Sequence, residues 1–347
     1  MKILYVHELF PPEIIGGGEI YAENLLLALK KRGIDVFVIT GTKKKTRLGK
    51  YKGIPVYRVN LFPSRYFFNL KSVPMIEKIV KKFKPDIIHG NAMQSAIPCY
   101  IVGKKYNIPI IINVHFFFQE YYRNYFDPVR SYMYSKIERF IMSFPYDKII
   151  SLDHYIYDNL KKIGIKSILI EHPINTKLFK PKKKPEKFTI GTAMTIGPSK
   201  RNDIFIKLAK KHKEFEYIAV GFYNKKFKNK LEKIGIKAPG YLPREKMPEF
   251  YNKISVYFGH GMAAKEAMAC GTPVILNENT ERLRKYHYKE LKAGLILTGS
   301  FDKLIKKLQN KKYYNNLSKK CSLFIKNNYS EKIIIPKIIK EYKKLIK

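Results

Sequence analysis

The chain has few cysteines and contains no long uncharged apolar run. Its three cysteines, Cys99, Cys270 and Cys321, lie far apart and at no zinc-ligand spacing. A structural zinc site is therefore excluded, and no disulfide framework is expected. No uncharged apolar run approaches the roughly 20 residues of a membrane-spanning helix, and no signal peptide is expected from the first residues, which lead directly into an apolar strand. These absences predict a cytoplasmic protein that is either soluble or peripheral at the inner face of the membrane.

Acidic residues are also scarce, because 28 Asp and Glu stand against 68 Lys and Arg in 347 residues, giving a formal net charge of +40. Such a field attracts nucleotide diphosphates, acidic lipid head groups or nucleic acid. The lysines are spread along the chain, so a lysine-rich composition bias explains the charge as well as a binding function does. A nucleic-acid binder would concentrate its lysines on one face and carry a recognition motif. No nucleic-acid partner is therefore expected.

The length and the hydrophobic pattern predict two α/β domains. A strand, a glycine loop, a helix and a second strand open the chain as a βαβ unit, which favours a parallel sheet with a right-handed crossover. Pro181-Lys-Lys-Lys-Pro185 reads as a charged linker, and the alternation of strands and helices resumes at Phe188. We expect two doubly wound, Rossmann-like domains, 1–180 and 181–329, facing a central cleft in which ligands bind.

The segment from Phe258 to Ile275 carries the clearest motif. It reads as a strand end, a glycine turn, a helix, a second glycine turn and a buried strand. Gly259 and Gly261 let the backbone approach a ligand closely, and the helix that follows begins with unpaired N–H groups that favour an anion such as phosphate. Glu266 can accept two hydrogen bonds from a vicinal diol, as on ribose. The alternative is that Glu266 is a solvated helix residue and the glycines are ordinary turn residues.

The string Glu266-Ala-Met-Ala-Cys-Gly-Thr-Pro-Val274 resembles, residue for residue, the second half of the nucleotide-binding signature of retaining GT-B glycosyltransferases of the family-4 type (group 1). The first half of that signature, Glu-Gly-Phe-Gly, differs because Phe258 stands in place of the first glutamate. The resemblance extends over essentially the whole chain. It implies the GT-B fold, with the last helix (330–347) packing back on the first domain.

The same resemblance implies a function in polysaccharide biosynthesis. The expected enzyme is a hexosyltransferase that moves a sugar, with retention, from a nucleotide-diphosphate sugar to a glycan or lipid-linked acceptor. No cofactor is expected, and the absence of an Asp-x-Asp pair argues against an obligatory metal. Because Phe258 and Thr195 replace a glutamate and an arginine of the family, the alternative function is a catalytically degenerate GT-B protein that binds a nucleotide or sugar nucleotide.

Candidate site residues follow from position and resemblance together. His115 lies just past the carboxyl end of a strand, where open α/β sheets place ligand groups. Lys200 precedes a helix and could neutralise a leaving diphosphate, with Arg201 as a substitute for the family arginine. The expected catalytic residues are His115 and Lys200. The expected donor-binding residues are Gly17, Lys200, Arg201, Leu242, Gly259, His260, Gly261, Met262 and Glu266. A structural histidine, a surface lysine and flexible glycine turns are the alternatives.

Two segments, 61–71 and 116–134, are dense in aromatic and basic residues. Aromatic faces stack on sugar rings and lie well at membrane interfaces, and arginine attracts lipid phosphate. Peripheral contact with an anionic membrane is therefore left open as a further partner surface. Core packing is the alternative for any single ring.

Overall fold

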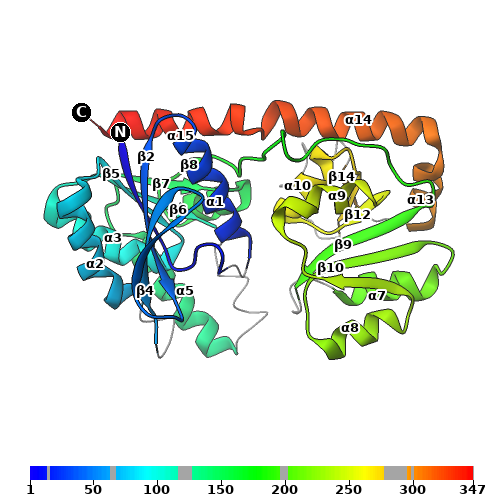
Figure 1. Ribbon diagram of the computed structural model, residues 1–347, viewed down its shortest axis with the longest axis horizontal. Helices are drawn as coiled ribbons and strands as arrows, with labels where there is room; N and C mark the ends of the chain where they lie inside the picture. Colours follow the sequence, from blue (N-terminus) through cyan, green and yellow to red (C-terminus); the bar gives the residue numbers. More distant parts are fainter. Residues whose placement is uncertain are drawn as a thin grey trace. The chain divides into compact units, whose positions relative to one another are not determined.

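The computed structural model describes residues 1–13, 16–62, 68–115, 127–195, 202–276, 295–297 and 301–346. They belong to two compact units, the first comprising Met1–Pro173 with Glu331–Lys347 and the second Ile174–Ser330. Figure 1 shows that each unit is an α/β sheet with helices on both faces. The predicted fold class, two parallel-sheet Rossmann-like domains, is confirmed. In the described ranges no helix combines the length and the apolar character that crossing a bilayer requires.

The sheet of the first unit has the order β3-β4-β2-β1-β5-β6-β7-β8. Its strands are β1 (Lys2–His7), β2 (Asp35–Thr42), β3 (Arg47–Tyr51), β4 (Ile54–Asn60), β5 (Ile87–Asn91), β6 (Ile110–Val114), β7 (Lys148–Ser151) and β8 (Ile168–Leu169). The pairs are parallel except that β3 runs antiparallel to β4 at the edge. Lys52 and Gly53, both at positive φ, form the two-residue turn of this hairpin. The sequence pattern missed the hairpin because β3 is exposed and shows no apolar alternation.

Helices cover both faces of this sheet. They are α1 (Gly17–Lys30), α2 (Phe68–Phe83), α3 (Met93–Tyr106), α5 (Pro128–Met142), α6 (His154–Lys162) and α15 (Glu331–Leu345). Side chains alternate along β1, so Ile3 and Tyr5 face the core under α1 and α15, whereas Leu4 and Val6 face the core under the other helices. The final helix α15 lies beside α1 and buries its apolar stripe in this unit (Figure 1). Tyr342 anchors it through its hydroxyl, 2.6 Å from Nδ1 of His89 in β5.

The sheet of the second unit is parallel, with the order β11-β10-β9-β12-β13-β14. Its strands are β9 (Thr189–Thr195), β10 (Glu216–Phe222), β11 (Ile236–Gly240), β12 (Val256–Phe258), β13 (Val274–Leu276) and β14 (Leu295–Leu297). Its helices are α7 (Asn202–Lys211), α8 (Lys225–Glu232), the 3-10 turn η3 (Arg244–Lys246), α9 (Met247–Asn252), α10 (Gly261–Ala269), α13 (Phe301–Gln309) and α14 (Lys311–Asn328). One core lies under α9, α10 and α14, and the other under α7, α8 and α13.

Strand order locates the ligand edge of each sheet. In the first unit the chain leaves β1 toward β2 and later returns to β5 on the other side of β1; in the second it leaves β9 toward β10 and returns to β12. Ligands bind open α/β sheets beyond the carboxyl ends of the strands at such reversals. The segments that follow β1, β5 and β6, and the one that follows β12, are therefore the positions where functional groups are expected.

The charged segment predicted as a linker is attached to the second unit. Ile174 and Phe179 already belong to the core of that unit, so the division falls at Ile174 and not at Pro181. Lys184 is half-buried, and its ammonium group donates to the Tyr251 carbonyl (3.2 Å) and to the Thr272 hydroxyl. Burial lowers the pKa of Lys184 to about 8. These bonds join the segment to the ends of α9 and α10, which is why it does not behave as a free linker.

Candidate functional site

The N-terminus of α10 lies at the ligand edge of the second sheet, where its first residue, Gly261, is exposed. The chain leaves β12 through Gly259 and enters α10 at Gly261, and both glycines have positive φ, +152° and +74°. A side chain at either position would strain the backbone. The N-cap residue His260 makes no side-chain capping hydrogen bond in the described part of the chain. The first turn of α10 therefore keeps N–H groups that can bind an anion.

Glu266 lies one turn further along α10, with only 2% of its surface exposed. Its Oε1 is 2.5 Å from Nη1 of Arg244 in η3, and its Oε2 accepts a hydrogen bond of 3.1 Å from the hydroxyl of Tyr251 in α9. The interpretation of Glu266 as a solvated helix residue is therefore wrong. Burial, and then the adjacent Glu266 carboxylate, raise the pKa of Tyr251 well above its usual range, so the Tyr251 hydroxyl keeps the proton that it donates.

Neither Arg244 nor Tyr251 was predicted as a site residue. The segment that contains them reads only as one more helix in the sequence. Both contacts join residues that are 15 or more positions apart and lie on different elements. Local periodicity carries no signal for such contacts, because they form only when η3, α9 and α10 pack together.

Phe258 occupies the position of the family's first glutamate and is a core residue. It is 2% exposed, and its ring lies 5.7 Å from that of Phe205 in α7. No carboxylate is present at this position, so Phe258 cannot accept a hydrogen bond from a sugar hydroxyl. The other substituted position, Thr195, ends β9. Lys200 and Arg201 lie outside the described residues.

Two further predicted donor residues lie in the second unit. Met262, in the first turn of α10, and Leu242, between β11 and η3, are partly buried and pack on the same core as Glu266's helix. Leu242 also lines a hollow of about 850 Å³ over β10 and β11, whose floor includes Ile218 and Phe250. Leu242 is thus a hydrophobic neighbour of η3, the element that carries Arg244.

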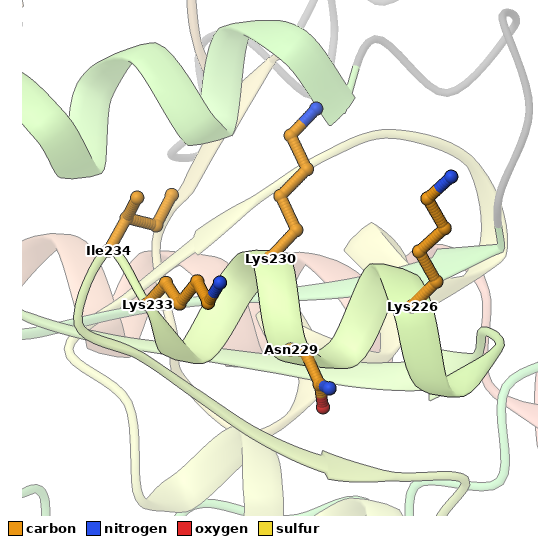
Figure 2. Close-up of a pocket in the computed structure, with 5 residues that line it drawn as sticks. All are labelled: Lys226, Asn229, Lys230, Lys233 and Ile234. Carbon is orange, nitrogen blue, oxygen red and sulfur yellow. The ribbon is translucent and has the colours of Figure 1, made fainter.

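A second hollow, beside α8, contains none of the predicted site residues. Its volume is about 450 Å³, and it is lined by Lys226, Asn229, Lys230, Lys233 and Ile234. Figure 2 shows Lys226 and Lys230 extending from one side of α8 and Asn229 from the opposite side. The lining holds three ammonium groups and no carboxylate, so it attracts anions. The only other polar group in its lining is the Asn229 carboxamide, which does not by itself select one anion, and we assign the hollow to the general positive surface.

In the first unit, polar side chains gather at the carboxyl ends of β5 and β6. Nε2 of His115 lies 2.6 Å from Oδ1 of Asn91. The same oxygen accepts a hydrogen bond of 3.1 Å from Nδ2 of Asn113, which also donates to the hydroxyl of Tyr21. A Cβ on Gly18 would lie 4.0 Å from the His115 ring, so the start of α1, where Gly17 is the first residue, adjoins His115.

This network determines the protonation of His115. Since Oδ1 of Asn91 is an acceptor, Nε2 of His115 carries the proton that it donates, and Nδ1 is the unprotonated nitrogen. Burial, followed by the neighbouring histidines His172, His7 and His89, lowers the pKa of His115 well below its usual 6.5. His115 is therefore a neutral hydrogen-bonding group and not a cationic acid.

The sequence reasoning gave no role to the other histidines around His115. The rings of His7 and His172 lie 6.4 Å and 5.6 Å from the His115 ring. His7 ends β1, and His115 follows β6. Both strands pair with β5, so the strand order alone would have predicted that His7 and His115 lie near one another. Among the described residues, no group of three or more His, Cys, Asp or Glu side chains is arranged to hold a metal ion.

Two family models match the chain, one over each half. The family model described as Glycosyltransferase Family 4 matches residues 15–178, and the model described as Glycosyl transferases group 1 matches residues 173–331. A search of curated proteins finds no match.

Solved structures match over nearly the whole chain. Sucrose-phosphate synthase from Thermosynechococcus elongatus is 17% identical with a TM-score of 0.86, covering 99% of this chain and 98% of that one. HepE from Anabaena, in complex with UDP and glucose, is 16% identical with a TM-score of 0.75, covering 99% and 100%. The catalytic domain of starch synthase IV from Arabidopsis thaliana, bound to ADP and acarbose, is 11% identical with a TM-score of 0.69, covering 99% of each. The fold is GT-B, and the chain belongs to the group 1 glycosyltransferases of the family-4 type.

Proposed function

We propose that this glycosyltransferase moves a sugar, with retention at the anomeric carbon, from a nucleotide-diphosphate sugar to a glycan or lipid-linked acceptor. The observation that carries the proposal is the α10 site, where an open helix N-terminus and a fixed, buried Glu266 lie on one helix. A nucleotide-diphosphate offers the matching groups, an anion and a ribose diol. HepE in complex with UDP-glucose and starch synthase IV bound to ADP support this choice of ligand.

The donor residues then have distinct roles. The N–H groups at Gly261 and Met262 bind the diphosphate, with help from the glycine turn at Gly259 and His260. Glu266 accepts hydrogen bonds from the ribose diol. Lys200, with Arg201 beside it, neutralises the charge that develops on the departing phosphate.

Retention proceeds from the front face of the donor sugar in this proposal. The acceptor hydroxyl attacks from the side that the diphosphate leaves, and the leaving phosphate takes the acceptor proton. This scheme needs no pair of carboxylates acting as nucleophile and acid, which agrees with the core position of Phe258. Neutral His115, held by Asn91, hydrogen-bonds to the reacting sugar, and Gly17 contacts the diphosphate or the acceptor.

The first test is binding of nucleoside diphosphates. UDP or ADP at about 100 times its dissociation constant should stabilise the protein by roughly 3 kcal/mol, which raises the melting temperature. Calorimetric titration gives the affinity directly. If none of the common nucleoside diphosphates binds, the donor assignment is wrong.

Transfer is tested separately, because the buried Phe258 favours one alternative, a protein that binds the nucleotide and does not turn it over. Incubation with the corresponding nucleotide sugars and a membrane extract should yield a glycosylated product whose anomeric configuration, measured by NMR, equals that of the donor. An inverted product contradicts retention. Tight binding without any product supports the degenerate alternative.

A membrane-bound acceptor is supported by the outer face of α5. Large apolar side chains repeat along it at helical spacing and are exposed by 48–68%: Val129, Tyr132, Met133, Ile137 and Phe140. The charges flanking them, Arg130, Lys136 and Arg139, are also exposed, whereas the one acidic residue of the helix, Glu138, is buried. The N-cap Asp127 is also exposed, and its carboxylate lies 3.4 Å from Nε of Arg130. An exposed apolar stripe with mainly positive charges beside it is typical of a helix that lies in an anionic membrane surface.

Vesicle binding tests this part of the proposal. We expect the protein to sediment with vesicles that contain phosphatidylglycerol and much less with pure phosphatidylcholine vesicles. Met133→Ser combined with Phe140→Ser should reduce the binding roughly 10-fold or more. Each of these side chains, once inserted into the membrane, contributes about 1.5–3 kcal/mol to the binding free energy. Leu323→Ser, on α14 and also exposed, is the matched control. Equal binding of both variants would contradict a role for α5.

A further inference from the structure

Arg244 makes fewer hydrogen bonds than its burial demands. Its side chain is 12% exposed, and the guanidinium lies over the Phe179 ring, 4.6 Å from the ring centroid. Nη1 is paired with Glu266, but Nε and Nη2 are buried without a hydrogen-bond partner among the described residues. Buried polar groups are nearly always paired, and arginine cannot lose its charge to relieve the cost.

The two unpaired nitrogens match a ligand oxygen. The N–H groups along one edge of a guanidinium form a planar fork that fits phosphate or carboxylate oxygens, and a carbonyl oxygen can accept from the same fork. The contact with the Phe179 ring restricts the movement of the guanidinium. Arg244 is therefore pre-organised to donate to an oxygen that the described residues do not supply.

Glu266 is left with two acceptor sites. An ionised carboxylate has about four lone-pair sites, two on each oxygen. Arg244 uses one on Oε1, and Tyr251 uses one on Oε2. With respect to the described part of the chain, one site remains on each oxygen, and the two hydroxyls of a vicinal diol can donate to both at once. Arg244 and Tyr251 thus set the orientation of the Glu266 carboxylate without occupying all of its acceptor sites.

We propose that Arg244 is both a positioning residue and a donor-binding residue. Its Nη1 holds Glu266 for the ribose diol, and its Nε–Nη2 edge binds an oxygen of the same nucleotide, on the diphosphate or on the base. The inference rests on the proposed function, because it assigns a role at the same nucleotide site. It adds a residue, Arg244, that neither the sequence pattern nor the comparisons identify.

Arg244→Lys separates the two roles. A lysine keeps a cation near Glu266, so the variant should fold, but it lacks the planar fork. We expect its affinity for UDP, or for ADP if UDP does not bind, to fall roughly 10-fold or more, as for the loss of a charge-assisted bond. Unchanged affinity overturns the binding role. Titration with the free nucleoside identifies the oxygen: an equal loss assigns the fork to the base, and no loss assigns it to the diphosphate.

A 2′,3′-dideoxy nucleotide tests the positioning role. The wild-type protein should prefer UDP over 2′,3′-dideoxy-UDP, because only UDP carries the diol. Arg244→Met should reduce this preference, Arg244→Lys should restore most of it, and Tyr251→Phe, which frees the other oxygen, should reduce it in part. A merely structural effect of the substitution would lower the affinities for UDP and for 2′,3′-dideoxy-UDP by the same factor. A preference that stays the same in Arg244→Met and Tyr251→Phe overturns the positioning role.

Glu266→Gln distinguishes this inference from the proposed function. If Glu266→Gln loses affinity for UDP and Arg244→Lys does not, the donor site stands and the binding role of Arg244 is wrong. If Glu266→Gln binds UDP as the wild type does, the donor site itself is wrong, and the role of Arg244 is overturned with it.

Discussion

Replacing Glu266 by glutamine is expected to weaken nucleotide-diphosphate binding by roughly 100-fold or more and to abolish measurable sugar transfer. Glutamine keeps the shape of the side chain but removes the charge that accepts the diol hydrogen bonds, and each bond to a charged group contributes about 1.5–3 kcal/mol. Calorimetry with the nucleotide and a transfer assay measure the two effects.

The same substitution should lower the free energy of unfolding. Glu266 is buried, and Arg244 is its ion-pair partner, so the variant leaves a buried cation without a counter-charge. Breaking such a pair costs about 3–5 kcal/mol, which urea unfolding will detect. Glu249→Gln is the matched control, because Glu249 pairs with Lys253 at 2.6 Å on the exposed side of α9 and an exposed pair contributes about 0–1 kcal/mol. If the control and Glu266→Gln behave alike, the assignment of Glu266 is wrong.

Mild acid is expected to destabilise the first unit before its carboxylates titrate. Burial lowers the pKa of His7 to about 3 and that of His89 to about 4, and it also lowers the pKa of His115 well below the usual 6.5. The unfolded chain therefore binds protons as the pH falls below 6.5, while the folded chain does not. These histidines therefore do not reduce the free energy of unfolding above pH 6.5, and they reduce it progressively as the pH falls below that value. At about pH 5 each histidine removes about 2 kcal/mol.

The three histidines together remove a large part of the 5–15 kcal/mol that is usual for a folded domain. Urea unfolding followed by circular dichroism at about pH 7, 6 and 5 measures this dependence. His89→Gln removes one of the three groups, so its stability at neutral pH should fall with the loss of the Tyr342 contact, but its further loss toward pH 5 should be smaller by about 2 kcal/mol. A stability that stays constant from pH 7 to 5 would contradict the neutral, buried state of these rings.

Much of the fold follows from local patterns. The apolar stretches at β1, β2, β5, β6 and β7 are short and bounded by turn residues, and such runs form buried parallel strands wherever helices can cover them. The hairpin of β3 and β4 was missed, because an exposed edge strand needs no apolar alternation. The attachment of Lys184 was also missed, since its acceptors lie 67 and 88 positions away in the chain.

The sequence by itself determined the α/β class, the two sheets and the glycines at the start of α10, and it singled out Glu266 as a candidate site residue. These features depend on residue type and spacing over a few positions, which the chain displays directly. Only the tertiary structure decided that Glu266 is held by Arg244 and Tyr251, that Phe258 is a core residue, and that Asn91 sets the proton on His115. Those contacts join separate elements, so they exist only when the sheets bring the elements together.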